Sequence, residues 1–136
     1  MTFIPYLYFD GTSEAAMDFY ADVFGADEVV KMRFKEAPPE IGMEQSDKIM
    51  YSHIKKDGWT LMSNDMAQGM PYQPQAGVSV AHHTKTVEEA RARFDRLSDG
   101  GAVIMPFEQQ FFSAGFGMCK DKFGTHWMIM VADEAS

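Results

Sequence analysis

Residues 16–29 read AMDFYADVFGADEV and specify a helix, a glycine corner and the start of a strand. Apolar side chains stand at positions 16, 19, 20, 23 and 24, a spacing that places them on one face of a helix. Thr12 or Ser13 can cap the start of this helix, and Gly25 can end it. The stretch therefore predicts an amphipathic helix that is followed by a strand over about 27–35.

The same succession returns in the second half of the chain. Thr86 and Glu89 have the spacing of a capping box, which marks a helix start. Gly100 and Gly101 end this helix, and residues 102–107 have the composition of a strand. The predicted buried face of the helix carries Val87, Ala90, Phe94 and Leu97.

Further strands complete two matching halves, each with the order βαβββ. They are expected at 3–9, 49–56 and 59–64 in the first half, and at 77–83, 112–120 and 125–131 in the second. One half can cover only one face of its small sheet with its own helix, so the other face stays open. We therefore expect an α+β fold in which two βαβββ modules form curved mixed sheets around an open cleft. The 136 residues make one domain, with module one at about 1–65, a linker at about 66–75 and module two at about 76–132.

Composition excludes several classes of partner. The formal net charge of −8 argues against a nucleic-acid partner, whose phosphates attract a basic surface. No apolar run is long enough to span a membrane, and the first residues do not resemble a signal peptide. The single cysteine, Cys119, cannot form an intramolecular disulfide. These features predict a cytoplasmic protein without a membrane partner.

Several short motifs resemble a known family. Residues 18–20 (DFY) and 24–26 (FGA) are similar to the first-helix signature of the glyoxalase/bleomycin-resistance (vicinal oxygen chelate) superfamily. Residues 116–118 (FGM) and 121–129 (DKFGTHWMI) resemble the pattern of its PhnB-like branch, as do residues 47–50 and 61–65. In order and spacing, the resemblance covers nearly the whole chain.

The resemblance implies paired βαβββ modules, a homodimer and a cleft into which four metal ligands project. Carried over to this chain, the four positions fall near Ile4, on Leu61, near Gly77 and on Met128. None of these is a usual ligand for a hard or borderline divalent metal. A shift of one residue provides no better donors: Pro5, Met62, Val78 and Ile129. We therefore predict no metal and no cofactor at these positions, which argues against the usual metal-dependent activities. Some PhnB-like chains carry a methyltransferase name, but no glycine-rich nucleotide-binding turn follows the first strand.

Strand alternation predicts which side chains face the cleft. In the last strand, Trp127 and Ile129 should lie beneath a helix, which turns Met128 and Met130 the other way. The same argument gives an apolar ligand-binding surface with a few hydroxyl groups: Tyr6, Tyr8, Leu61, Ser63, Ser79, Met128 and Met130. The alternative is that these side chains fill a closed core. For Leu61 and Met128 the sequence supports a core position about as well as a ligand-binding position.

The sequence assigns no catalytic group. His82 and His83 are neighbours in a strand and should point to opposite faces, so they cannot easily share one metal. We expect these two, His53 and His126 to be ordinary hydrogen-bonded histidines. Glu108 and Asp121 are expected in a solvated loop or turn, and Cys119 as a buried, inert thiol.

Three functions remain open. The first is a PhnB-like protein that binds a small organic ligand in an apolar cleft without the usual metal. The second is a drug-sequestering protein of the bleomycin-resistance type, because an acidic, aromatic cleft suits a cationic glycopeptide. The third is a metal-dependent lyase or dioxygenase with ligands outside the four positions.

Overall fold

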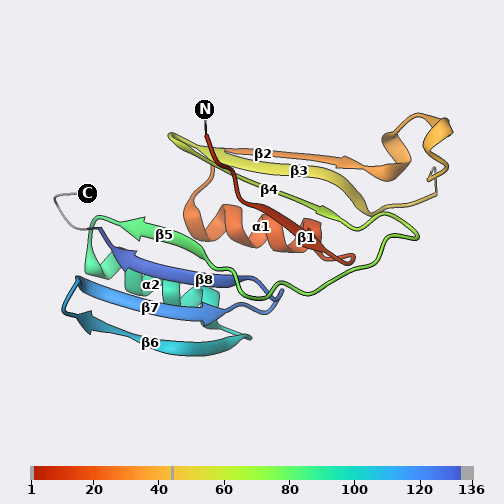
Figure 1. Cartoon of the computed structure of the whole chain (residues 1–136). Helices are drawn as coiled ribbons and strands as arrows, with labels where there is room; N and C mark the ends of the chain where they lie inside the picture. The colour runs from red at the N-terminus through yellow and green to blue at the C-terminus, as the bar shows by residue number, and fades with distance from the viewer. Residues whose placement is uncertain (1, 44, 133–136) are drawn as a thin grey trace. The chain divides into compact units, whose positions relative to one another are not determined.

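The computed structural model describes residues 2–43 and 45–132 (Figure 1). The chain forms two compact units, Met1–Pro74 and Gln75–Ser136. Each unit contains one helix and four strands in the order βαβββ. The predicted α+β fold, with two βαβββ modules built on open mixed sheets, is confirmed.

In the first unit the strand order is β1-β4-β3-β2, with β1 parallel to β4 and the other neighbours antiparallel. The first strand begins at Tyr6, later than expected, because Pro5 has no N–H group to donate to a neighbouring strand. The second strand ends at Arg33, where a short 3-10 turn buries Phe34. The elements of this unit are β1 (Tyr6–Phe9), α1 (Ser13–Phe24), β2 (Glu28–Arg33), β3 (Ile49–Lys56) and β4 (Trp59–Asp65), with 3-10 turns at Phe34–Glu36 and Pro39–Ile41.

The second unit repeats this topology with the order β5-β8-β7-β6, and β5 is parallel to β8. The strand expected over 102–107 continues to Gln110, and its pairing with β7 is interrupted by bulges. The elements are β5 (Val80–Thr84), α2 (Val87–Ser98), β6 (Ala102–Gln110), β7 (Ser113–Lys120) and β8 (His126–Val131).

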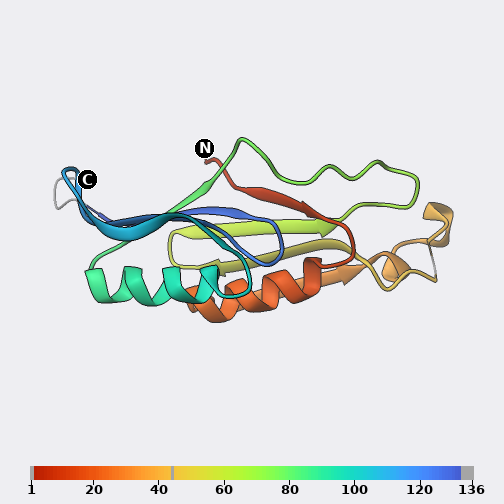
Figure 2. The same cartoon turned by 90° about the horizontal axis from the view of Figure 1, so that it is seen from below.

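Each helix covers one face of its own sheet (Figures 1 and 2). In the first unit Tyr20 of α1 and Phe9 of β1 are both fully buried. In the second unit Leu97 of α2 and Ile129 of β8 are fully buried as well. Burial of each such side chain contributes about 1.5–3 kcal/mol. Within the described residues, no helix has the length and apolar character needed to cross a membrane.

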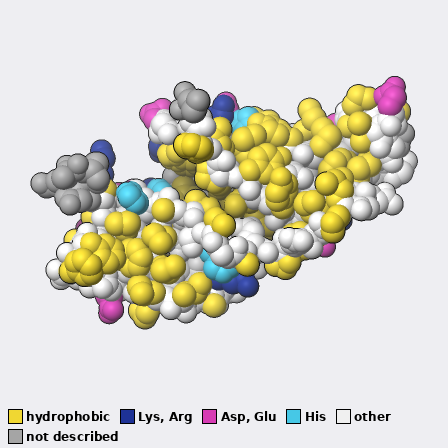
Figure 3. Space-filling view, viewed as in Figure 1, with side chains coloured by type: hydrophobic (Ala, Val, Ile, Leu, Met, Phe, Trp, Pro, Cys, Tyr) yellow, Lys and Arg dark blue, Asp and Glu magenta, His cyan; other side chains and the backbone are white. Residues whose placement is uncertain are grey.

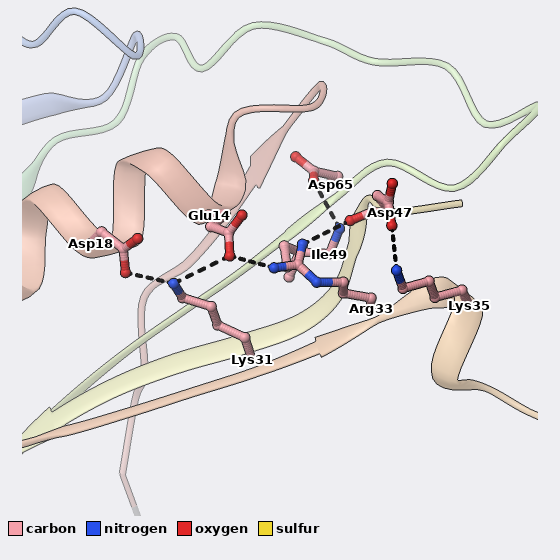
Figure 4. Close-up of polar contacts among 8 residues, drawn as sticks. All are labelled: Glu14, Asp18, Lys31, Arg33, Lys35, Asp47, Ile49 and Asp65. Carbon is pink, nitrogen blue, oxygen red and sulfur yellow. Dashed lines mark hydrogen bonds and ion pairs between the residues drawn. The ribbon is translucent and has the colours of Figure 1, made fainter. Parts of the chain in front are cut away.

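The start of α1 is held by a distant carboxylate. Asp65, at the end of β4, is buried, and its Oδ1 accepts hydrogen bonds from the backbone N–H groups of Gly11 (2.8 Å) and Ser13 (2.9 Å). Its Oδ2 accepts from the N–H of Ile49 at 2.9 Å (Figure 4). The helix begins at the expected position, but Asp65 and not a side chain of Thr12 or Ser13 provides the cap. Thr12 is the N-cap residue, but its side chain makes no capping hydrogen bond.

The other predicted helix boundaries are confirmed. Gly25 ends α1 with a left-handed backbone conformation (φ 70°), which glycine adopts without steric cost. Thr86 caps α2, because its Oγ1 accepts a hydrogen bond of 3.1 Å from the N–H of Glu89.

Candidate functional site

The helix-free face of the second unit carries a row of methionines. Met105, Met118 and Met128 are register partners across β6, β7 and β8, and we call them the methionine row. Met118 and Met128 are half-buried and Met105 is exposed. Met130 follows on the same face of β8, whereas Ile129 between them is fully buried beneath α2. The predicted orientation of Met128 and Met130 is confirmed.

Two members of this surface could not be found from the sequence. Met105 and Met118 join the row only through the pairing of β6 and β7, which contains several register shifts. Next to the methionine row, Met130 of β8 is the register partner of Phe116 on β7 and of His83 on β5. Ser79, a predicted ligand-binding residue, is half-buried but precedes β5, so no strand pairing places it on this face.

The helix-free face of the first unit is aromatic and polar. Tyr6 and Tyr8 are 40% and 51% exposed, and their ring centroids lie 5.4 Å apart. Tyr6 is the register partner of Met62, which in turn pairs with His53. Together with Tyr51, these residues form what we call the tyrosine face. In Figure 3 a broad hydrophobic area lies over the strands of this unit.

The predicted orientation of Leu61 and Ser63 is wrong. Both are buried on the side of β4 that packs against α1, and the Ser63 hydroxyl lies 2.7 Å from the hydroxyl of Ser13. The parallel register of β1 and β4 sets Tyr6 opposite Met62, so Met62 takes the open side that was assigned to Leu61. The buried cap Asp65 shares the side of Leu61 and Ser63.

A hydrogen-bonded chain of three polar side chains lies on the tyrosine face. The Tyr51 hydroxyl is 2.5 Å from Nδ1 of His53, and Nε2 of His53 is 2.7 Å from a carboxylate oxygen of Glu28. The His53 side chain is only 13% exposed. This agrees with the expectation of a hydrogen-bonded histidine, but the two partners were not foreseen.

The other histidines differ from one another. His82 is hydrogen-bonded through Nε2 to Arg93 at 2.5 Å. Burial, the positive charge of Arg93 and the neighbouring His83 lower the pKa of His82 to about 4. The buried Nδ1 of His126 has no hydrogen-bond partner among the described residues, which departs from the expectation for this nitrogen. His83 is exposed.

Asp121 is not the solvated turn residue that the sequence indicated. It is 3% exposed and accepts hydrogen bonds from the N–H groups of Phe123 (2.8 Å) and Thr125 (3.1 Å). Its other oxygen accepts from the indole N–H of Trp127 at 2.8 Å. Asp121 therefore holds the turn between β7 and β8 to the core. Cys119 is a buried free thiol whose pKa is raised by burial, as expected for an inert cysteine.

A cluster of ion pairs lies on the side of the first sheet that packs against α1 (Figure 4). Glu14 of α1 is 2.5 Å from Arg33 and 3.4 Å from Lys31, and Lys31 is 2.6 Å from Asp18. The hydrogen bond from Arg33, with smaller contributions from Lys31, lowers the pKa of Glu14. These partly exposed pairs link α1 to β2 and lie on the opposite side of the sheet from the tyrosine face.

Comparison with known proteins identifies the family. Residues 1–130 match the sequence model of the family described as 3-demethylubiquinone-9 3-methyltransferase. The chain belongs to this family. It is also 30% identical to Protein YjdN of Escherichia coli K12, over 98% of this chain and 97% of that protein.

Solved structures of relatives agree with this family assignment. Protein PA1353 from Pseudomonas aeruginosa is 31% identical, with a TM-score of 0.89 over 96% of this chain and 97% of that one. A Bacillus cereus protein described as a putative 3-demethylubiquinone-9 3-methyltransferase, PhnB protein, is 26% identical, with a TM-score of 0.74 over 97% and 100%. A glyoxalase/bleomycin resistance protein from Albidiferax ferrireducens T118 shares the fold, with a TM-score of 0.67 at 12% identity over 96% and 97%. The predicted fold, that of a glyoxalase/bleomycin resistance protein, is thus confirmed by this likeness.

The residues at the superfamily's metal positions do not fit a divalent metal. Ile4 and Leu61 have no donor atom, and Leu61 is buried beneath α1. Gly77 has no side chain, and the thioether of Met128 is a soft ligand. Within residues 2–43 and 45–132, no group of three or more histidine, cysteine, aspartate or glutamate side chains could hold a metal ion.

Two shallow depressions are described on the second unit. One lies beside Gly101 and Asp121, and the other beside Phe111 and Val131. Neither includes Met128 or Met130. The expectation of a cleft between the two modules stays a prediction.

Proposed function

We propose that this PhnB-like protein binds a small, partly apolar organic molecule on a helix-free sheet face, without a metal at the superfamily's usual positions. The observation that carries the proposal is the methionine row. Three unbranched, polarisable side chains lie side by side and partly exposed on the face of the sheet opposite to α2. Methionine surfaces adapt to ligands of different shape, which suits a binding site.

The tyrosine face supports the same proposal for the first unit. Tyr6 and Tyr8 present aromatic rings together with hydroxyl groups, so this face suits a molecule that is apolar at one end and polar at the other. Ser79 stays a proposed contributor on the second unit. Sequestration of a cationic drug stays an alternative, which the net charge of −8 favours. The methyltransferase activity in the family's description is not part of the proposal.

A homodimer in the cytoplasm is the proposed state of the protein. The edge strands β2 and β6 support pairing of two copies, because they carry exposed apolar side chains: Val29, Val30, Met32, Val103, Ile104 and Met105. Light scattering at micromolar concentration is expected to give the mass of two chains. A strictly monomeric mass would contradict this part of the proposal.

A nuclear magnetic resonance titration tests ligand binding. With methionine methyl groups labelled, we expect 4-nitroanisole, a neutral aromatic probe, to shift the methyl signals of Met118, Met128 and Met130. Met17 is fully buried beneath the first sheet and is the internal control, because its signal should stay in place. Signals that do not move at millimolar probe, or a Met17 signal that moves as far as the others, would argue against a binding surface.

A further inference from the structure

Three side chains of the first unit form a continuous chain of hydrogen bonds. Tyr51 and His53 are two residues apart on β3, so they lie on the same face of the sheet. Glu28 reaches His53 from β2, the neighbouring strand. The chain therefore runs from the Tyr51 hydroxyl through the imidazole ring to the Glu28 carboxylate.

The chemistry of the three groups determines which atom donates and which accepts in each hydrogen bond. An ionised carboxylate only accepts hydrogen bonds, so Nε2 of His53 must carry the hydrogen that Glu28 accepts. In the neutral ring Nδ1 then has no hydrogen and must accept from the Tyr51 hydroxyl. The remaining lone pairs of the Tyr51 oxygen are left to accept a hydrogen bond from a ligand.

The surroundings favour a planar, acidic ligand. Met62 lies between His53 and Tyr6 in the register of the sheet and provides an apolar floor. Burial, together with the neighbouring Tyr8 and Tyr51, raises the pKa of Tyr6, so its hydroxyl stays protonated and can donate to a ligand oxygen. The ammonium group of Lys55 also faces Glu28, at 4.0 Å from its carboxylate.

We propose that Tyr51, His53 and Glu28 form a proton relay that takes the proton of an acidic hydroxyl, a phenol or an enol, bound on the tyrosine face. This inference rests on the proposed binding function and assigns its substrate class. The hydroxyl of the ligand gives its proton to the Tyr51 oxygen, while Tyr51 gives its own proton to Nδ1 of His53. The products are the ligand anion, neutral Tyr51 and an imidazolium that is paired with Glu28, so protons and charge balance. Tyr51 contacts the ligand, and Glu28 is a positioning residue.

The experiment uses 4-nitrophenol, whose anion absorbs visible light, and 4-nitroanisole, which has the same ring but no acidic proton. We expect bound 4-nitrophenol to be more ionised than free 4-nitrophenol at the same pH. An increase in ionisation on binding is diagnostic, because the net charge of −8 alone would oppose formation of an anion. Tyr51→Phe should weaken binding of the anion about tenfold or more, the effect of losing one hydrogen bond to a charged group.

Matched variants separate the relay from the surface around it. Tyr72→Phe removes a hydroxyl from the segment between β4 and β5, outside the tyrosine face, and should change affinity by less than about twofold. Glu28→Gln should keep the binding of 4-nitroanisole but move the ionisation of bound 4-nitrophenol to higher pH. A merely structural Glu28 would instead change the affinity for both probes and leave this ionisation in place.

The outcomes distinguish the relay from the proposed function. Binding of both probes with equal ionisation of bound and free 4-nitrophenol would overturn the relay and leave the binding function in place. If neither probe binds to the tyrosine face, the relay and the proposed binding function of this face are both overturned. Nitrogen chemical shifts of His53 test the relay without a ligand, because they must report hydrogen on Nε2 and a bare Nδ1 at neutral pH. The opposite tautomer would refute the proposed proton direction.

Discussion

The Oδ1 atom of Asp65, the last residue of β4, lies 2.9 Å from the backbone nitrogen of Ser13, the first residue of α1. The same carboxylate also accepts from Gly11 and Ile49. Asp65→Ala leaves the buried N–H groups of Ser13 and Ile49 without acceptors, together with the part-buried one of Gly11. It should destabilise the protein by about 3 kcal/mol, at about 1–3 kcal/mol for each buried unpaired group. Urea denaturation measures the loss, with exposed Asp57→Ala as the control that should change stability by less than about 0.5 kcal/mol. Equal effects of the two variants would contradict the capping role.

Gly117 of β7 has no space for a side chain beneath α2. A Cβ atom at this position would lie 2.7 Å from the ring of Phe94 and 3.0 Å from the backbone of Phe107. Gly117→Ala should therefore cost about 1–3 kcal/mol, the usual cost of overpacking a core. Phe94→Leu should restore part of the loss in a double-mutant cycle measured by thermal melting. Strictly additive effects of the two changes would show that the ring is not the obstacle.

Neighbouring residues of β8 provide a test of the two faces. Met128 is half-buried on the helix-free face and Ile129 is fully buried beneath α2. Met128→Glu should fold, because its carboxylate reaches water. Ile129→Glu should lose the folded state, since an unpaired buried charge costs several kcal/mol. Circular dichroism and thermal melting distinguish the two, and an unfolded Met128→Glu would mean that this face belongs to a closed core.

His82 should make stability depend on pH. Its pKa is about 4 in the folded protein against an ordinary 6.5, so between these values the unfolded chain binds a proton that the folded protein does not. Stability is therefore complete above about 6.5 and falls as the pH falls toward 4, by about 1–2 kcal/mol after solvent screening of the partly exposed ring. His82→Gln, which can still accept from Arg93, should show a flatter slope in urea denaturation over this range. His83→Gln, on the exposed neighbour, should keep the slope of the wild-type protein.

The sequence predicts the repeated fold well because its signals are local. Helix periodicity, the Thr86 cap and the Gly25 corner each depend on residues close together in the chain. In β8 the prediction that Trp127 and Ile129 lie beneath the helix is also confirmed, since both are buried.

The site depends on long-range pairing, which the sequence does not display. In β4 both faces carry apolar side chains, so only the register with β1 decides that Met62 and not Leu61 faces outward. The contact of Glu28 with His53 likewise requires the pairing of β2 with β3. Strand alternation alone cannot supply either relationship.

The Asp65 carboxylate also has a consequence for hydrogen exchange. The amide of Ile49 is far along the chain from those of Gly11 and Ser13, yet all three donate to this one side chain. Their protons can exchange with solvent only when the carboxylate releases them, so the three amides share one opening event. The first turn of α1, the start of β3 and the end of β4 then open as a single cooperative unit, whose opening free energy is the same whichever of the three amides reports it.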